Sequence, residues 1–192
     1  MTWFVVDGMD GTGKSTIAKE IKKLLETRHR KVLLIEHPDK NKLIGRLESR
    51  FLQSNSGKIA KIMTTLTFIT DVIGSLIEKW LRNEEYDDFV FVRYIMSVAY
   101  LPDKFAPKAY RIIADILPMP DNRILVDADV DVALGRIDNR GDELELFENR
   151  DDLIRTRKIM IELSEDGWIV IDNSGPRDQI DRILKQLVES CI

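Results

Sequence analysis

Short apolar runs alternate along the chain with longer stretches in which apolar residues return at helical spacing. The first run, Trp3–Val6, is continuous and typical of a strand that is buried on both faces. Residues 14–27 follow it and place Ile17, Ile21 and Leu24 on one face of a predicted helix. Four further runs predict strands at residues 32–35, 89–91, 124–126 and 168–171. Strands that alternate with helices predict an α/β fold, with a five-stranded parallel sheet sandwiched between helices.

Composition narrows the class of protein. The chain has 192 residues, of which 44% are hydrophobic, and no linker-like stretch divides it, so we expect a single domain over residues 1–192. A net charge of -4 argues against nucleic acid as a partner. One cysteine, Cys191, can form neither an intramolecular disulfide nor a cysteine metal site, and no apolar run is long enough for a bilayer. We therefore expect a cytoplasmic protein that does not bind a membrane.

The residues after the first strand match a phosphate-binding motif. Gly8 to Ser15 fits G-x-x-x-x-G-K-[ST], with a predicted strand before it and a predicted helix after it. Such a loop turns its backbone N–H groups towards a phosphate, and the following helix adds the positive end of its dipole. We expect ATP here, with Lys14 on the β- and γ-phosphates and the Ser15 hydroxyl as a ligand of Mg²⁺. The predicted cofactor-binding residues of the loop are Gly8, Asp10, Gly11, Thr12, Gly13, Lys14, Ser15 and Thr16.

Further stretches of the chain resemble thymidylate kinases and follow that family's order. Residues 4–16 resemble its opening strand and loop, and residues 93–100 are similar to its D-R-Y-x-x-S-x-x-A-Y stretch. Residues 68–71 resemble the helix that stacks a phenylalanine on thymine, and residues 127–141 resemble its fourth strand and the start of its lid. The resemblance implies a P-loop kinase fold, ATP and Mg²⁺ as cofactors, and a phosphotransferase that converts dTMP or a related monophosphate to the diphosphate.

The resemblance also implies roles for individual side chains. Lys14 would hold the donor, and Arg93 would bridge the donor and acceptor phosphates. Arg140 would supply positive charge from a lid at about residues 140–152, and Arg136 would lie near the adenine and complete the cofactor-binding set. The residues expected to bind the acceptor are Asp10, Glu36, Phe68, Arg93, Ser97 and Tyr100.

Four positions depart from the family pattern. Val92 stands where the family has a carboxylate that helps organise the metal and the acceptor side. Glu36 stands where the family usually offers an arginine to the acceptor phosphate, and Val72 replaces a second arginine, on the thymine-reading helix. Leu146 stands at the place of a lid arginine. Gly11 occupies the place where some members carry a P-loop arginine, so the resemblance implies the version in which the lid supplies the positive charge.

Two alternatives stay open at this point. Glu36 also occupies a strand end where deoxynucleoside kinases place the general base for a sugar hydroxyl, which would make the acceptor a nucleoside. The second alternative is a nucleotide-binding protein with little catalytic activity, in which Val92 and Val72 have replaced residues that the reaction needs. Arg93, at the end of a buried strand beside the loop, suits a phosphate clamp, with a structural ion pair as the alternative. Without the resemblance, Phe68 would be a core residue, and His37 is either a base or a loop histidine. The expected partners are a small nucleotide or nucleoside acceptor and a second copy of the chain in a homodimer.

Overall fold

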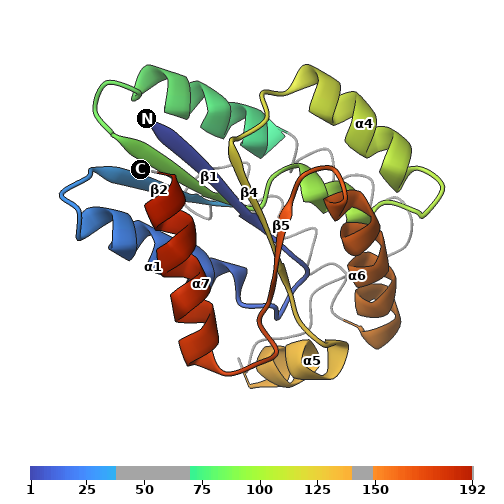
Figure 1. Cartoon of the computed structure of the whole chain (residues 1–192). Helices are drawn as coiled ribbons and strands as arrows, with labels where there is room; N and C mark the ends of the chain where they lie inside the picture. Colours follow the sequence, from blue (N-terminus) through green and yellow to red (C-terminus); the bar gives the residue numbers. More distant parts are fainter. Residues whose placement is uncertain (38–69, 140–148, 192) are drawn as a thin grey trace.

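Five parallel strands form the centre of the protein (Figure 1). The computed structural model describes residues 1–37, 70–139 and 149–191. The strands lie side by side in the order β2-β3-β1-β4-β5, and every neighbouring pair is parallel. Their bounds are β1 Thr2–Asp7, β2 Val32–Glu36, β3 Asp88–Val92, β4 Asn122–Asp127 and β5 Ile169–Asp172. The predicted α/β fold with a five-stranded parallel sheet is confirmed.

Helices cover both faces of this sheet (Figure 1). Helices α1 and α7 pack on one face, while the helix at residues 70–81, η1, α4, α5 and α6 contribute to the core on the other. The remaining bounds are α1 Lys14–Glu26, η1 Ile95–Tyr100, α4 Ala106–Ile116, α5 Val130–Asp138, α6 Arg150–Ser164 and α7 Arg177–Ser190. Because the chain crosses from strand to strand through helices, the carboxyl ends of all five strands meet at one edge of the sheet.

The central strand shows why the sheet needs cover on both faces. Phe4 and Val6 of β1 face the core shared with α1 and α7, whereas Trp3 and Val5 face the opposite core. All four side chains are buried. A strand whose two faces are both apolar cannot leave either face in water, so the continuous apolar run read from the sequence fixes the central position of this strand.

Two segments differ from the sequence-based prediction. The sequence predicts a helix at residues 97–101, and the structure has the 3₁₀-helix η1 at this place. Residues 141–152 are charged and show no clear period, so the sequence predicts no helix there. Helix α6 nevertheless begins at Arg150, because the side chain of Asn149 accepts a hydrogen bond from the Asp152 N–H at 2.9 Å. The sequence also predicts helices at about residues 43–53 and 58–83. The first of these, the beginning of the second and the segment 140–148 lie outside the described residues.

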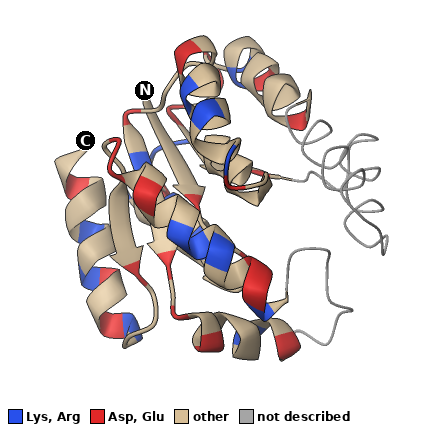
Figure 2. Cartoon of the chain, turned by 90° about the vertical axis from the view of Figure 1, so that its right-hand side faces the viewer, with Lys and Arg blue, Asp and Glu red and all other residues tan. Residues whose placement is uncertain are grey.

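The described helices carry mixed charges on their outer surfaces. Figure 2 shows Lys and Arg interspersed with Asp and Glu rather than gathered on one face. In the ranges 1–37, 70–139 and 149–191, no helix has the length and apolar character needed to cross a membrane.

Candidate functional site

The loop from Gly8 to Gly13 turns the chain from the end of β1 into the start of α1. Gly11 and Gly13 have φ angles of 77° and 88°, in the left-handed region that side chains rarely adopt. A Cβ atom on Gly11 would also lie 2.4 Å from the carbonyl oxygen of Ala133 in α5. An arginine at position 11 therefore does not fit this backbone, so the loop cannot supply the cation that some thymidylate kinases carry there.

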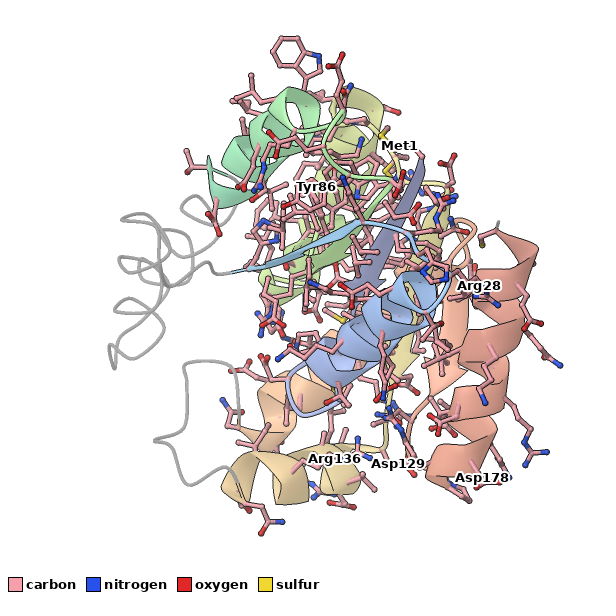
Figure 3. The ribbon with its side chains drawn as sticks, turned by 90° about the vertical axis from the view of Figure 1, so that its left-hand side faces the viewer. Met1, Arg28, Tyr86, Asp129, Arg136 and Asp178 are labelled. Atoms are coloured by element: carbon pink, nitrogen blue, oxygen red, sulfur yellow. The ribbon has the colours of Figure 1, made fainter. Side chains whose placement is uncertain are left out.

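Two side chains hold the outer turn of this loop. The Asn173 Nδ2 donates a hydrogen bond to the Thr12 carbonyl at 2.7 Å, and Arg136 Nη1 donates to the same carbonyl at 3.3 Å. Arg136 Nη2 in turn donates to the Asn173 carbonyl at 2.7 Å. Figure 3 shows Arg136 on α5, at the end of the molecule where α1 begins. Sequence analysis missed Asn173, which carries no motif and is recognisable only by its place directly after β5.

Four side chains from distant parts of the chain form a buried polar cluster beside the loop, which we call the Asp10 cluster: Asp10, Lys14, Arg93 and Tyr100. The Asp10 Oδ1 lies 3.1 Å from Lys14 Nζ and also accepts from Arg93, and Asp10 Oδ2 accepts from the Tyr100 hydroxyl at 2.9 Å. Asp10 and Lys14 are only 6% and 7% exposed. Arg93 has a φ of 67°, which is uncommon for a non-glycine residue and typical of functional sites.

The single carboxylate of the Asp10 cluster lies between two cations that repel each other. Burial alone would raise the pKa of Asp10, but Arg93 and Lys14 outweigh it and hold that pKa well below its usual range. Burial lowers the pKa of Lys14, and the positive charge of Arg93 lowers it further. Burial and the Asp10 carboxylate together raise the pKa of Tyr100. With Asp10 ionised and both cations charged, the cluster has one net positive charge, which suits an anionic ligand.

Asp7, at the end of β1, is a further functional candidate that sequence analysis missed. It is fully buried, its Oδ1 accepts from the Gly8 N–H at 3.0 Å, and its Oδ2 accepts from the Tyr94 N–H at 2.8 Å. Burial raises the pKa of Asp7. Its carboxyl group thus ties the start of the phosphate loop to the turn after β3. An acidic residue at the end of a buried strand was the signal that could have found it.

A cavity of about 480 Å³ opens next to the Asp10 cluster, at the carboxyl ends of β2 and β3. The predicted site residues that line it are Asp10, Gly11, Gly13, Lys14, Ser15, Thr16, Glu36, Arg93 and Arg136. Four others do not line it and are buried: Gly8, Thr12, Ser97 and Tyr100. The structure therefore brings together the phosphate loop and residues from β2, β3 and α5, as the strand order requires.

Glu36 and His37 close the cavity at the end of β2. The Glu36 Oε1 lies 3.3 Å from the Nζ of Lys19 on α1. His37 is buried, and its Nδ1 lies 3.1 Å and 3.0 Å from the carbonyl oxygens of Val92 and Arg93, so this nitrogen carries the proton. The His37 Nε2 lies within hydrogen-bond distance, 2.8 Å, of Ser75 Oγ. With both ring nitrogens bonded in this way, His37 joins β2, β3 and the helix at 70–81 and has a structural role.

The cations near the predicted lid have carboxylate partners in α5 and β4. Arg157 in α6 donates two hydrogen bonds of 2.8 Å to Asp127, at the end of β4. Arg150 is the second arginine of the predicted lid segment 140–152 and pairs with the exposed Asp131 of α5. Arg140 and Phe68 lie outside the described residues.

Comparison with known proteins gives a consistent result. The thymidylate kinase family model matches residues 6–183. The chain is 27% identical over 194 residues to a probable thymidylate kinase of Metallosphaera sedula, covering 100% of this chain and 94% of the relative. It is 30% identical over 179 residues to the thymidylate kinase of Xanthomonas campestris pv. campestris, with 92% and 78% covered. The solved thymidylate kinase of Candida albicans shares the fold, with a TM-score of 0.74 at 19% identity over 98% of this chain and 91% of that chain.

Proposed function

The chain belongs to the thymidylate kinase family, and we propose that it transfers the γ-phosphoryl group of ATP to dTMP, giving ADP and dTDP. The observation that carries this proposal is the Asp10 cluster beside the phosphate loop. Two cations, Lys14 and Arg93, are held there by a single carboxylate at the wall of a cavity. Phosphoryl transfer asks a protein mainly for such positioned positive charge.

The donor would bind along the loop and the start of α1. Lys14 and the backbone N–H groups of the loop would hold the β- and γ-phosphates of ATP. Ser15 lines the cavity next to Lys14, and its hydroxyl suits Mg²⁺, which takes oxygen ligands. In the described ranges no group of three or more His, Cys, Asp or Glu side chains could hold a metal, so Ser15 would share the ion with phosphate oxygens. When bound, Mg²⁺ neutralises charge on those phosphates.

The acceptor would enter from the side of β2 and β3. Arg93 lines the cavity and would lie between the donor and acceptor phosphates. A monophosphate is largely ionised at neutral pH, since its second pKa is about 6, so its attacking oxygen needs no general base. A nucleoside hydroxyl would need one, and the carboxylate at that place, Glu36, is paired with Lys19. This ion pair offsets the charge that Glu36 would present to an acceptor phosphate, which is compatible with a monophosphate as acceptor.

A panel assay tests the proposal. ATP consumption would be followed with nucleosides and nucleoside monophosphates, and we expect turnover with dTMP and little with thymidine. Turnover with thymidine alone would support the nucleoside kinase alternative. Binding of ATP without turnover on any acceptor would support the nucleotide-binding alternative. A homodimer and a cytoplasmic location stay predictions of the sequence.

A further inference from the structure

The end of β3 lacks the carboxylate that P-loop enzymes place near their magnesium ion. In P-loop NTPases the ion is held by the Ser or Thr of the loop and by an aspartate at a strand end. Here the last residue of β3 is Val92, which is buried in the core shared with Val6 and Ile17. If Mg²⁺ binds at Ser15, its carboxylate partner has to come from another strand.

Glu36, at the cavity wall, has a carboxylate oxygen that accepts no hydrogen bond from the described residues. Asp10 also lines the cavity, but its oxygens are occupied by Lys14, Arg93 and Tyr100. The Glu36 Oε1 is shielded from solvent and has no hydrogen-bond partner in the part of the chain that the structure describes. Its 3.3 Å contact with Lys19 Nζ is an ion pair without hydrogen-bond geometry.

The sheet register places Glu36 beside the vacant position. Glu36 of β2 is the direct partner of Val92 in β3, so both side chains lie at the same height on the sheet. Both also point to the face covered by α1, because Val92 packs in that core and Glu36 reaches Lys19. The two residues line the same cavity as Ser15.

The distances favour contact through water. Neighbouring strands are about 4.8 Å apart. Glutamate is longer than aspartate by one methylene, about 1.5 Å. The extra methylene therefore makes up only part of the distance between the two strands. Since β2 lies one strand further than β3 from β1 and its phosphate loop, a carboxylate on β2 would meet a bound ion through a water molecule.

We propose that Glu36 accepts hydrogen bonds from water bound to the Mg²⁺ of the donor complex, replacing from β2 the carboxylate that position 92 lacks. This rests on the proposed function, because the ion enters with ATP. Lys19 holds the carboxylate before the nucleotide binds and competes with the ion for it. Glu36 is then a positioning residue of the metal site and neither a general base nor a surface ion pair.

Mn²⁺ binding gives a readout that does not depend on turnover. Electron paramagnetic resonance would measure the affinity of the complex of protein and non-hydrolysable ATP analogue for Mn²⁺. Removing an outer carboxylate of a metal site typically costs 10–100-fold in affinity, so we expect Glu36→Gln to weaken Mn²⁺ binding by about tenfold or more. Lys19→Met is the matched control, because it breaks the same ion pair but leaves the carboxylate free. We expect it to leave Mn²⁺ affinity unchanged or to raise it.

The two variants separate the possible roles of Glu36. A simple ion pair predicts the same small loss of stability in both variants and no change in Mn²⁺ affinity, which would overturn the proposal. A general base predicts a fall in kcat on nucleosides with unchanged Mn²⁺ affinity, which would also overturn it. In a Glu36→Gln background, Val92→Asp should restore Mn²⁺ affinity, provided that thermal unfolding shows a folded protein. Failure of the wild type to bind the ATP analogue, measured without metal, would count against the proposed function instead.

Discussion

Replacing Asp10 with asparagine tests whether the Asp10 cluster is an ionic unit. The substitution keeps the size of the side chain and an oxygen that can accept from Tyr100. It removes the negative charge that Lys14 and Arg93 share, so two cations would face each other in a buried place. Removing one partner of a buried ion pair costs about 3–5 kcal/mol, because the remaining charge is uncompensated. For a domain of this size that lowers Tm by about 6–20 °C.

Calorimetry with and without ATP would measure this effect. We expect Asp10→Asn to lower the Tm of the free protein, and ATP with Mg²⁺ to raise the Tm of the variant more than that of the wild type, because the phosphates replace the missing charge. Asp178→Asn is the control: it breaks an exposed pair with Arg182 in α7 and should shift Tm by at most a few degrees. Equal Tm values and equal ATP effects in Asp10→Asn and wild type would refute the reasoning.

The same substitution carries a pH signature. Burial works against ionisation of Asp10, but Arg93 and Lys14 prevail, and the pKa of the folded state lies below the ordinary value of about 3.9. A carboxyl group with a lowered pKa contributes stability that is fully present above its unfolded pKa and is lost as pH falls through its folded pKa. The Tm difference between wild type and Asp10→Asn should therefore be constant from pH 8 to pH 5 and shrink below about pH 4.

Three further substitutions address the loop and its support. Lys14→Ala removes a charge-assisted contact worth about 1.5–3 kcal/mol, so calorimetric titration should show ATP affinity reduced about tenfold or more; equal affinity would contradict the phosphate-loop assignment. Gly11→Ala should lower Tm because of its left-handed φ and the 2.4 Å approach to a carbonyl, whereas Gly135→Ala, with nothing within 4 Å, should leave Tm unchanged or raise it. Tyr100→Phe leaves the Asp10 Oδ2 without its donor and should cost about 1–3 kcal/mol in urea unfolding, and no loss would mean that water replaces the hydroxyl.

The fold was predictable from the sequence because its signals are local. The apolar run at Trp3–Val6, the glycine-rich turn and the helical repeat of residues 14–27 each depend on neighbours within a few positions. Together they fix a strand, a loop and a helix in order, and the alternation of such units leaves few arrangements other than a parallel sheet. Boundaries were less certain at α6, where a single capping side chain, Asn149, starts the helix inside a charged stretch without periodicity.

The candidate site was predictable only in part, because its decisive contacts join distant residues. Asp10 meets Tyr100 across 90 positions, and Asn173 meets Thr12 across 161. Neither pair leaves a periodic pattern in the sequence. The left-handed backbone of Arg93 is likewise a tertiary feature: its N–H donates to the Val6 carbonyl while its guanidinium turns to Asp10. Propensity alone would not place an arginine there.

The ion pair with Lys19 changes how strongly Glu36, which stands where the family has an arginine, would repel an acceptor phosphate. A lone carboxylate about 4 Å from an acceptor phosphate would repel it by about 4 kcal/mol at an effective dielectric of about 20, which would count against a monophosphate. The Lys19 Nζ lies 3.3 Å from that carboxylate, so an approaching anion meets a dipole whose field falls off faster than that of a single charge. Val92, the position where the family has a carboxylate, is the direct neighbour of Glu36 in the sheet. The end of β3 lacks the carboxylate of the family, and the end of the neighbouring strand β2 carries an additional one. The acidic group has thus moved by one strand, which is compatible with a working metal site and a monophosphate acceptor.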